Sequence, residues 1–489
     1  MAGSISRIKP VSQLMAESDQ SEKGLKRTLG AVNLVALGIG AIIGAGLFVR
    51  TAAATANNAG PSVTLAFVVA AVGCALAGLC YAEFAAMIPI AGSAYTYSYA
   101  TLGELVAWII GWDLVLEYAL GAATVAIAWS EYLNKLLEFF NLHVPYALSH
   151  SPFESMNGEK GMINLPALFI LFMLTLLLIK GTQESAFVNG LIVALKVTIV
   201  ILFIIFGWGF INPANYVPYI PAPTTYVDPQ GIPHNFGGTL GILGAAGVVF
   251  FAYIGFDAVS TAAQEAKNPK RDMPIGILGS LAICTVLYIL FGHVLTGVAS
   301  LEDFRTAGKE ASVTYAIQTH MPGFGWLAKL VTVAILAGFS SVILVMLLGQ
   351  SRVFYSMSKD GLLPRVFSEL HPKFRTPYKS NWILFVFVGF FAAFVPGDIA
   401  GDMTSIGTLF AFILVCFGVI VMRRTNPDMP RGFRTPLVPA VPILGAIVCA
   451  SMIYGLGWPN WARLVVWLIV GFVIYFAYSR HHSKLETGN

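Results

Sequence analysis

The sequence holds twelve apolar stretches, each long enough to form a helix across a lipid bilayer. Such a helix needs about 20 largely apolar residues to cross roughly 30 Å of hydrocarbon. Of the 489 residues, 57% are hydrophobic and 11% are charged, whereas about a quarter of the residues of a soluble domain are charged. We therefore expect an all-α integral membrane protein with 12 transmembrane helices. They begin near Leu34, Val63, Leu105, Ile163, Ala186, Thr239, Ile275, Trp326, Asn381, Asp402, Val438 and Ala462.

Both ends of the chain are expected in the cytoplasm. An even number of spans places them on one side, where 21 of the 29 lysines and arginines would lie, against seven on the other side and Lys196 inside the bilayer. Cytoplasmic loops carry an excess of positive charge. The first 28 residues are polar, so we expect no cleavable signal peptide. The net charge of +4 indicates no nucleic-acid partner.

Glycines interrupt the first and sixth spans. The first span contains Gly38, Gly40, Gly44 and Gly46, and each glycine costs about 1 kcal/mol against alanine in a helix. Close helix packing would explain Gly40 with Gly44, but the pair flanking Ala45 favours an unwound stretch with free N–H groups. The sixth span carries Gly241, Gly244 and Gly247, and its break is expected near 253–255.

Corresponding breaks in two halves are typical of inverted repeats, with spans one to five matching six to ten upside down. Half-helix N-termini then favour a carboxylate, and unwound carbonyl groups favour a cation. One site would thus suit both ends of an amino acid.

Lys196 lies about halfway along the fifth span, where burial of a lysine costs roughly 2.5–3.5 kcal/mol. It should face the interior of the bundle. A static ion pair joining two helices is one interpretation. The functional one is a lysine that gains and loses a proton as a cavity opens and closes.

Acidic side chains add to this pattern. Asp113 and Glu117 lie four residues apart on one face of the third span. Glu117, the deeper one, could be the partner of Lys196, a proton carrier or part of a cavity wall. Asp257 could have either a gating or a structural role. Glu83 and Glu265 lie nearer span ends and are expected to be solvated or to aid packing.

Other classes of function fit poorly. Of eight histidines only His293 falls within a span, and no serine has a His-Asp framework, so we expect no enzyme, metal site or cofactor. A channel remains the competing class, although a pore gives no reason for a midplane lysine. The five cysteines lack CxxC spacing and are interpreted as small buried side chains: Cys74, Cys80, Cys284, Cys416 and Cys449.

Six motifs resemble one known family, the amino acid–polyamine–organocation (APC) transporter superfamily, and within it the bacterial relatives of the cationic amino acid transporter (CAT) family. The resemblance covers almost the whole chain. The motifs are GIGAIIGAGLF at 38–48, GLCYAEF at 78–84, GSAYTYSY at 92–99, FAYIGFD at 251–257, KNPKRDMP at 267–274 and QSRVFYSMSKDGLLP at 350–364.

The resemblance implies the leucine-transporter (LeuT) type of fold, with a 5+5 inverted repeat, broken helices 1 and 6, and two further helices. The expected parts are a cytoplasmic segment at 1–33, a first repeat at 34–210, an extracellular loop at 211–238, a second repeat at 239–424, spans eleven and twelve at 425–479 and a cytoplasmic tail at 480–489.

It also implies roles for particular residues. The substrate carboxylate would meet N–H groups around Gly44, Ala45 and Gly46, and its ammonium the carbonyls of Ile42, Phe251 and Ile254. Phe251 and Asp257 would gate, Met346 would line the side-chain pocket, and Lys196 with Glu117 would couple transport to protons in place of sodium. The substrate-binding set is Ile42, Ile43, Gly44, Ala45, Gly46, Phe251, Ala252, Ile254 and Met346.

Two departures bear on the substrate. Glu117 stands where animal cationic transporters more often have an uncharged residue, and Ala45 offers no hydroxyl. The pocket could take cationic amino acids or small neutral ones such as alanine. We expect proton-coupled import across the plasma membrane by alternating access, with amino acid exchange as the alternative. The expected partners are substrate, proton, membrane lipid and a possible small single-span membrane protein.

Overall fold

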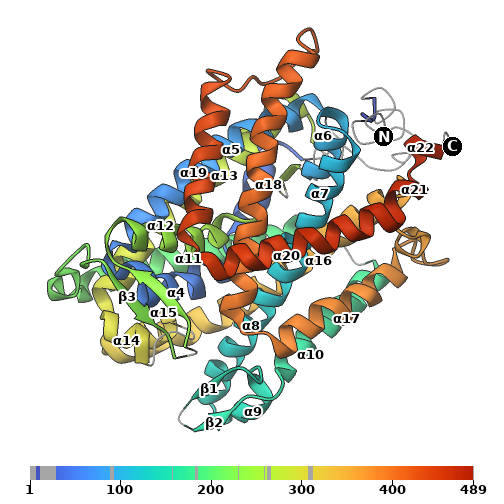
Figure 1. Cartoon of the computed structure of the whole chain (residues 1–489). Coiled ribbons are helices and arrows are strands. Elements are labelled where there is room, and N and C mark those ends of the chain that lie inside the picture. Colours follow the sequence, from blue (N-terminus) through green and yellow to red (C-terminus); the bar gives the residue numbers. More distant parts are fainter. Residues whose placement is uncertain are drawn as a thin grey trace.

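The chain is built from helices that run through one bundle (Figure 1). The computed structural model describes residues 7–10, 29–88, 93–156, 158–181, 186–229, 231–257, 259–260, 266–306 and 312–487. Within these, seven helical runs are long and apolar enough to cross a membrane: Gly46–Met87, Glu104–Glu138, Gly190–Phe210, Pro269–Val298, Gly325–Lys359, Gly397–Thr425 and Trp458–His482. Seven such runs indicate a multi-pass membrane protein.

Five shorter apolar helices accompany the long runs: Ala31–Ile42, Leu165–Lys180, Gly238–Tyr253, Tyr378–Phe394 and Ala440–Gly455. Together with the long runs they fall on the twelve predicted stretches. At 10 to 17 residues each is shorter than a full span, so twelve crossings stay a prediction.

The helices that carry predicted site residues have clear boundaries. They are α3 (Ala31–Ile42), α5 (Val63–Met87), α7 (Glu104–Val115), a π-helical turn (Leu116–Leu120), α8 (Gly121–Glu138), α11 (Ala186–Gly207), α12 (Gly238–Val249), α13 (Pro269–Val298), α16 (Gly325–Lys359) and α18 (Gly397–Thr425).

The remaining helices complete the bundle and its ends. These are α4 (Thr51–Ala54), α6 (Ser93–Thr101), α9 (Tyr146–Ser149), α10 (Leu165–Lys180), α14 (Leu301–Thr306), α15 (Ser312–His320), α17 (Tyr378–Phe394), α19 (Ala440–Gly455), α20 (Trp458–Ile474), α21 (Arg480–His482) and α22 (Lys484–Thr487). Helices α10 and α17 lie side by side at the edge of the bundle (Figure 1).

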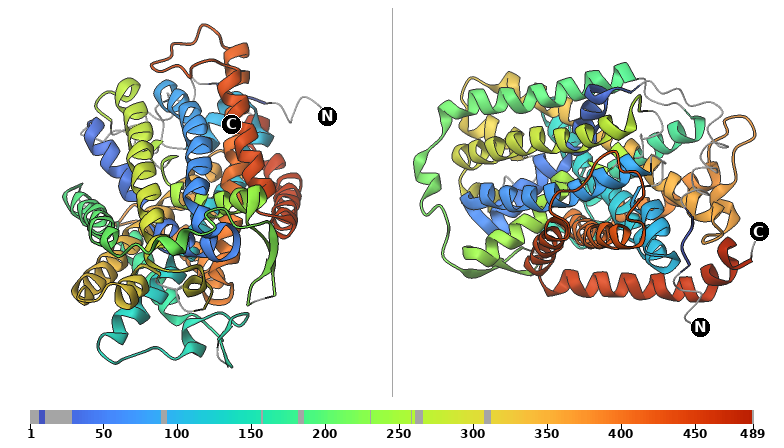
Figure 2. Two further views of the ribbon diagram at one scale, coloured as in Figure 1. Left: turned by 90° about the vertical axis from the view of Figure 1, so that its left-hand side faces the viewer. Right: turned by 90° about the horizontal axis from the view of Figure 1, so that it is seen from above.

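Two small antiparallel hairpins mark one end of the bundle. They are β1 (Ser155–Met156) with β2 (Glu159–Lys160), and β3 (Thr224–Val227) with β4 (Pro233–Phe236). The connection between α18 and α19 lies at the opposite end, as Figure 1 and the left view of Figure 2 show. Arg7 is within 3.6 Å of Glu486 on α22, so the two described terminal segments lie together.

Small residues allow the central helices to pack closely. A Cβ atom on Gly38 of α3 would sit 2.4 Å from Oγ of Ser280 on α13. Gly38 therefore lets α3 pack closely on α13. At Gly44 and Gly46 the chain leaves the regular α-helix.

Candidate functional site

The first helix is interrupted at the glycine pattern. Helix α3 ends at Ile42, and Ile43 is extended with ψ 104°. The chain becomes helical again from Ala45, where a π-helical segment, Gly46–Arg50, begins. The N–H groups at the start of a helical segment have no intrahelical acceptor, and among the described backbone contacts none satisfies those of 44–46. These groups can receive an anion such as a carboxylate.

The sixth predicted span, which begins with α12, loses its helical conformation at 254, within the predicted range 253–255. Helix α12 ends at Val249 and gives way to a 3-10 turn, Phe250–Tyr253, after which Ile254 is extended with ψ 135°. Gly255 has φ 111°, and a Cβ atom there would lie 2.9 Å from the carbonyl oxygen of Ala41. Only glycine adopts this conformation without strain, so the sequence at 255 determines where the helix breaks.

The two interruptions touch each other. A Cβ atom on Gly46 would lie 2.2 Å from Cα of Ala252, so the backbones approach as closely as glycine allows. The Tyr288 hydroxyl of α13 lies 3.1 Å from the carbonyl oxygen of Ile42 and 3.0 Å from that of Ala252. One hydroxyl proton can serve either carbonyl at a time. Tyr288 thus links both breaks.

Sequence reasoning missed Tyr288. The available signal was a hydroxyl in the middle of an apolar span, which must find an acceptor inside the protein.

The predicted substrate-binding residues gather around these breaks and are closed to solvent. The exposed fraction is at most 5% for the non-glycine members, and Gly44 and Gly46 are buried as well. Met346 of α16 packs against Gly121 of α8, where a Cβ atom would lie 3.1 Å from its sulfur, and Thr404 is the next neighbour of that position. Val342 faces Gly44. The surroundings of Gly44 and Met346 are mainly apolar.

Lys196 of α11 lies between α3 and α16, which are the first and eighth predicted spans. It is 1% exposed, and its Nζ donates a hydrogen bond of 2.8 Å to the carbonyl oxygen of Gly40 on α3. Its stem runs over Gly338 of α16, where a Cβ atom would sit 2.7 Å from Cε. None of the ion pairs between described residues joins Lys196 to Glu117.

Glu117 lies beside Asp257 instead. Both are fully buried, and Thr408 of α18 is also adjacent to the Glu117 carboxyl group. The Tyr118 hydroxyl donates a 2.8 Å hydrogen bond to Oδ2 of Asp257. The two carboxyl groups therefore share one buried site with the Tyr118 hydroxyl. The π-helical turn that carries Glu117 is a feature that often occurs at functional sites.

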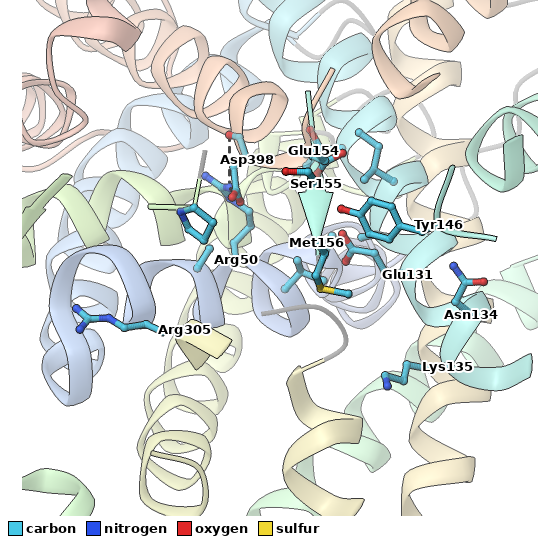
Figure 3. A pocket seen from close by; sticks show the side chains of 18 of the residues that line it. Arg50, Glu131, Asn134, Lys135, Tyr146, Glu154, Ser155, Met156, Arg305 and Asp398 are labelled. Carbon is cyan, nitrogen blue, oxygen red and sulfur yellow. Dashed lines mark hydrogen bonds and ion pairs between the residues drawn. The ribbon is translucent and has the colours of Figure 1, made fainter. Parts of the chain in front are cut away.

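A cavity of about 390 Å³ leads from these breaks toward the hairpin end of the molecule (Figure 3). Of the predicted substrate-binding residues, Ala45 lines it. Its walls come from the second half of the first helix, from α8 and from the connections that bear β1 and α14. Charged residues of both signs line it, including Arg50, Glu131, Glu154, Arg305 and Asp398.

Arg50 forms an ion-pair bridge across this cavity. Its side chain is 2% exposed, lies 3.0 Å from Oδ1 of Asp398 and also pairs with Asp402, both on α18. Sequence reasoning counted Arg50 among outer-loop charges and missed the pairing, because partners some 350 residues apart leave no local pattern. The bridge thus forms part of the wall of the same cavity that Ala45 lines.

Asp303 stabilises α14, whose residues Arg305 and Thr306 line the cavity. It lies in α14, outside the long apolar runs, and pairs with His320 of α15 at 3.1 Å. Burial raises the pKa of Asp303, but hydrogen bonds from the Ser300 hydroxyl and N–H outweigh it and hold the pKa below the usual value. The group is therefore ionised near neutral pH, when it can hold α14 to α15.

The N-terminal segment is tied to α16 at the opposite end of the bundle. Lys9 is 4% exposed and its Nζ lies 2.7 Å from Oδ1 of Asp360, just after α16. The Tyr95 hydroxyl donates to Oδ2 of the same carboxylate at 2.7 Å. Asp360 belongs to the motif at 350–364, so this residue of the motif anchors the N-terminal segment.

The other acidic residues are placed as follows. Glu83 accepts hydrogen bonds from Arg423 and Arg431 at 2.8 to 3.1 Å, in agreement with the expected packing role. Asp113 is fully buried on α7. Glu265 lies outside the described residues. Within the described parts of the chain no group of three or more His, Cys, Asp or Glu side chains could hold a metal ion.

Known proteins resemble this chain over nearly its whole length. The family model described as amino acid permease matches residues 29–478. The branched-chain amino acid permease BcaP of Bacillus subtilis is 44% identical over 486 residues, covering 99% of this chain and 100% of the relative. The methylthioribose transporter of the same organism is 42% identical, with 99% of both chains covered. The vacuolar cationic amino acid transporter 4 of Arabidopsis thaliana is 33% identical, with 87% and 68% covered.

Proposed function

Because this chain belongs to the amino acid permease family of the APC superfamily, we propose that it carries an L-amino acid into the cell together with a proton. The observation that carries the proposal is the contact between the two helix breaks at Gly46 and Ala252. The free N–H groups of the first break receive the substrate carboxylate, and the carbonyl groups of both breaks receive its ammonium. The transporter class, rather than an enzyme, agrees with the names of the relatives.

The proposed substrate is a neutral amino acid with an apolar side chain. Val342 and Met346 border the place where that side chain would lie, and Glu117 lies beside Asp257. Two relatives are named branched-chain amino acid permeases, which supports this choice. Cationic amino acids and methylthioribose, suggested by the names of other relatives, are the competing substrates.

The proposed fold is the LeuT type with twelve spans, in which residues 34–210 and 239–424 form the inverted repeats. The plasma membrane and cytoplasmic termini complete this proposal. It is supported by interruptions at corresponding helices and by buried cations that pair with acids at the two ends of the bundle, Arg50 with Asp398 and Lys9 with Asp360. A carrier that alternates its access needs contacts that open and close at both ends, whereas an open pore does not.

Uptake into proteoliposomes tests the substrate and the coupling. We expect labelled leucine, isoleucine or valine to accumulate under an inward proton gradient, and unlabelled arginine and methylthioribose to compete weakly. Uptake unchanged after collapse of the pH gradient and the membrane potential would contradict proton coupling. Flux that needs amino acid on both sides, whatever the gradient, would identify an exchanger instead.

A further inference from the structure

A groove beside the beginning of α13 lies outside the substrate site. It has a volume of about 620 Å³ and lies between the first turns of α13 and the connection from α18 to α19. Its lining residues are Asn268, Lys270, Arg271, Pro274, Ile275, Leu278, Gly432 and Phe433. Half of the motif at 267–274 therefore lines this groove, and the transport proposal gives that motif no role.

Among the described residues, the cations at the mouth of the groove have no acidic partner. Lys270 and Arg271 are both exposed, and no ion pair between described residues includes either of them. The nearest acid along the helix, Asp272, is 7% exposed, and its carboxylate accepts a hydrogen bond from the Asn268 N–H at 3.2 Å. Two positive charges at this mouth therefore attract an anion.

The far wall of the groove is held in place. A Cβ atom on Gly432 would lie 2.5 Å from Cβ of Lys270, so the connection packs directly on α13. Arg431 next to it is 2% exposed and lies 3.1 Å from the buried carboxylate of Glu83. The groove is thus formed before any ligand arrives, which lowers the entropic cost of binding.

An apolar stripe continues from the cations along the same helix. Ile275, Ile283, Val286 and Leu290 are 40%, 42%, 59% and 36% exposed. Their spacings of 8, 3 and 4 residues place them on one face of α13. Since α13 is one of the seven runs apolar enough to cross a membrane, this face meets the acyl region of the bilayer.

We propose that this groove binds the headgroup of an anionic phospholipid, with an acyl chain along the stripe on α13. The order of cations at the helix end followed by exposed apolar residues matches the order of phosphate and acyl chain in such a lipid. A soluble anion would be bound by Lys270 and Arg271 alone and would leave the stripe uncovered.

Native mass spectrometry of the full-length protein in detergent tests the proposal with phosphatidylglycerol and phosphatidylcholine. We expect the wild-type protein to retain phosphatidylglycerol in preference. The double variant K270Q/R271Q should bind phosphatidylglycerol roughly 30-fold more weakly, about fivefold for each lost cation near the surface. The matched control is K373Q/R375Q, which removes two exposed cations between α16 and α17 and should retain the lipid.

Three results would overturn the proposal. Equal retention of the two lipids would remove the role of charge, and equal loss in the control variant would remove the role of this groove. Displacement of phosphatidylglycerol by millimolar inorganic phosphate would identify a site for a free anion. A monodisperse size-exclusion profile of each variant shows that the fold is intact.

Discussion

At the scale of single residues, glycines set the geometry of the candidate site. Gly46 and Gly255 differ from the other glycines of these spans because a side chain at either would meet backbone atoms of the facing break. Backbone cannot rotate away as a flexible side chain can. The sequence pointed to Gly44 and Gly46 as a pair, but the structure gives Gly44 the softer contact, at 3.3 Å from a Val342 methyl group.

Gly46→Ala is expected to abolish substrate binding. The added methyl group must separate the two breaks, and overpacking of this kind costs roughly 1–3 kcal/mol. Substrate-induced thermal stabilisation of purified protein measures the effect. Gly190→Ala is the matched control, because a Cβ atom there has nothing within 4 Å. Normal binding by Gly46→Ala would place the substrate elsewhere.

Tyr288→Phe isolates one hydroxyl group. It should reduce transport about tenfold while retaining the fold, since a lost hydrogen bond is worth roughly 0.5–1.5 kcal/mol. Initial uptake rates measure it. Tyr216→Phe removes a hydroxyl that donates to the His293 carbonyl at 2.6 Å outside the site, and it should transport normally. Similar rates for both variants would leave Tyr288 with a packing role only.

At the scale of elements, α11 contacts both α3 and α16 through Lys196. Lys196 reaches Gly40 of α3 by its ammonium and Gly338 of α16 by its stem. A proton lost from Lys196 would remove the charge that strengthens the bond to the Gly40 carbonyl. The first helix would then be free to move relative to α16.

Lys196→Ala should prevent accumulation while binding persists. The accumulation ratio is expected to fall to about 1, because the gradient no longer biases the two states. Gly338→Val should act in the same direction by displacing the lysine stem, and the double variant should be no worse than Lys196→Ala alone. Accumulation at the wild-type level by Lys196→Ala would return the lysine to a structural role.

Arg50 joins the first predicted span to α18 in the wall of the cavity of Figure 3. Arg50→Gln should lower transport strongly, since removing one partner of a buried pair costs about 3–5 kcal/mol. R50Q/D402N leaves no unpaired buried charge and should recover part of the activity. Counterflow measurements compare the two variants with Asp398→Asn, whose carboxylate is more exposed and should matter less. Equal loss in all three would argue against a gate.

At the scale of the whole molecule, we predict the orientation in the membrane from the distribution of charge. The predicted inner side holds three times as many lysines and arginines as the outer side. In this predicted orientation the hairpin β1–β2 and the cavity of Figure 3 face outward, and the groove beside α13 faces the cytoplasm. The five native cysteines are buried, so introduced cysteines can be labelled selectively.

A cysteine at Ser155 should react with an impermeant maleimide added to intact cells. A cysteine at Ser368, between α16 and α17, should react only after the membrane is made permeable. Mass shift on a gel reports both reactions. The opposite pattern would reverse the orientation, and reaction of both in intact cells would contradict an odd number of crossings between them.

The sequence by itself determined the class of the molecule and the places where its helices break. Apolar stretches of this length form helices across lipid, and glycine at 44, 46 and 255 lowers the conformational cost of interrupting them. Both features depend on local sequence and can therefore be predicted from it. The lysine in the fifth span was equally visible, because lipid penalises charge.

Which groups meet depends on how the helices pack. The structure places Glu117 beside Asp257 rather than in an ion pair with Lys196, brings Tyr288 to both breaks and joins Arg50 to Asp398 in the cavity wall. These contacts join residues from about 35 to 350 positions apart. Helical periodicity gives the face of each residue but not the neighbouring helix, so the partners follow from packing alone.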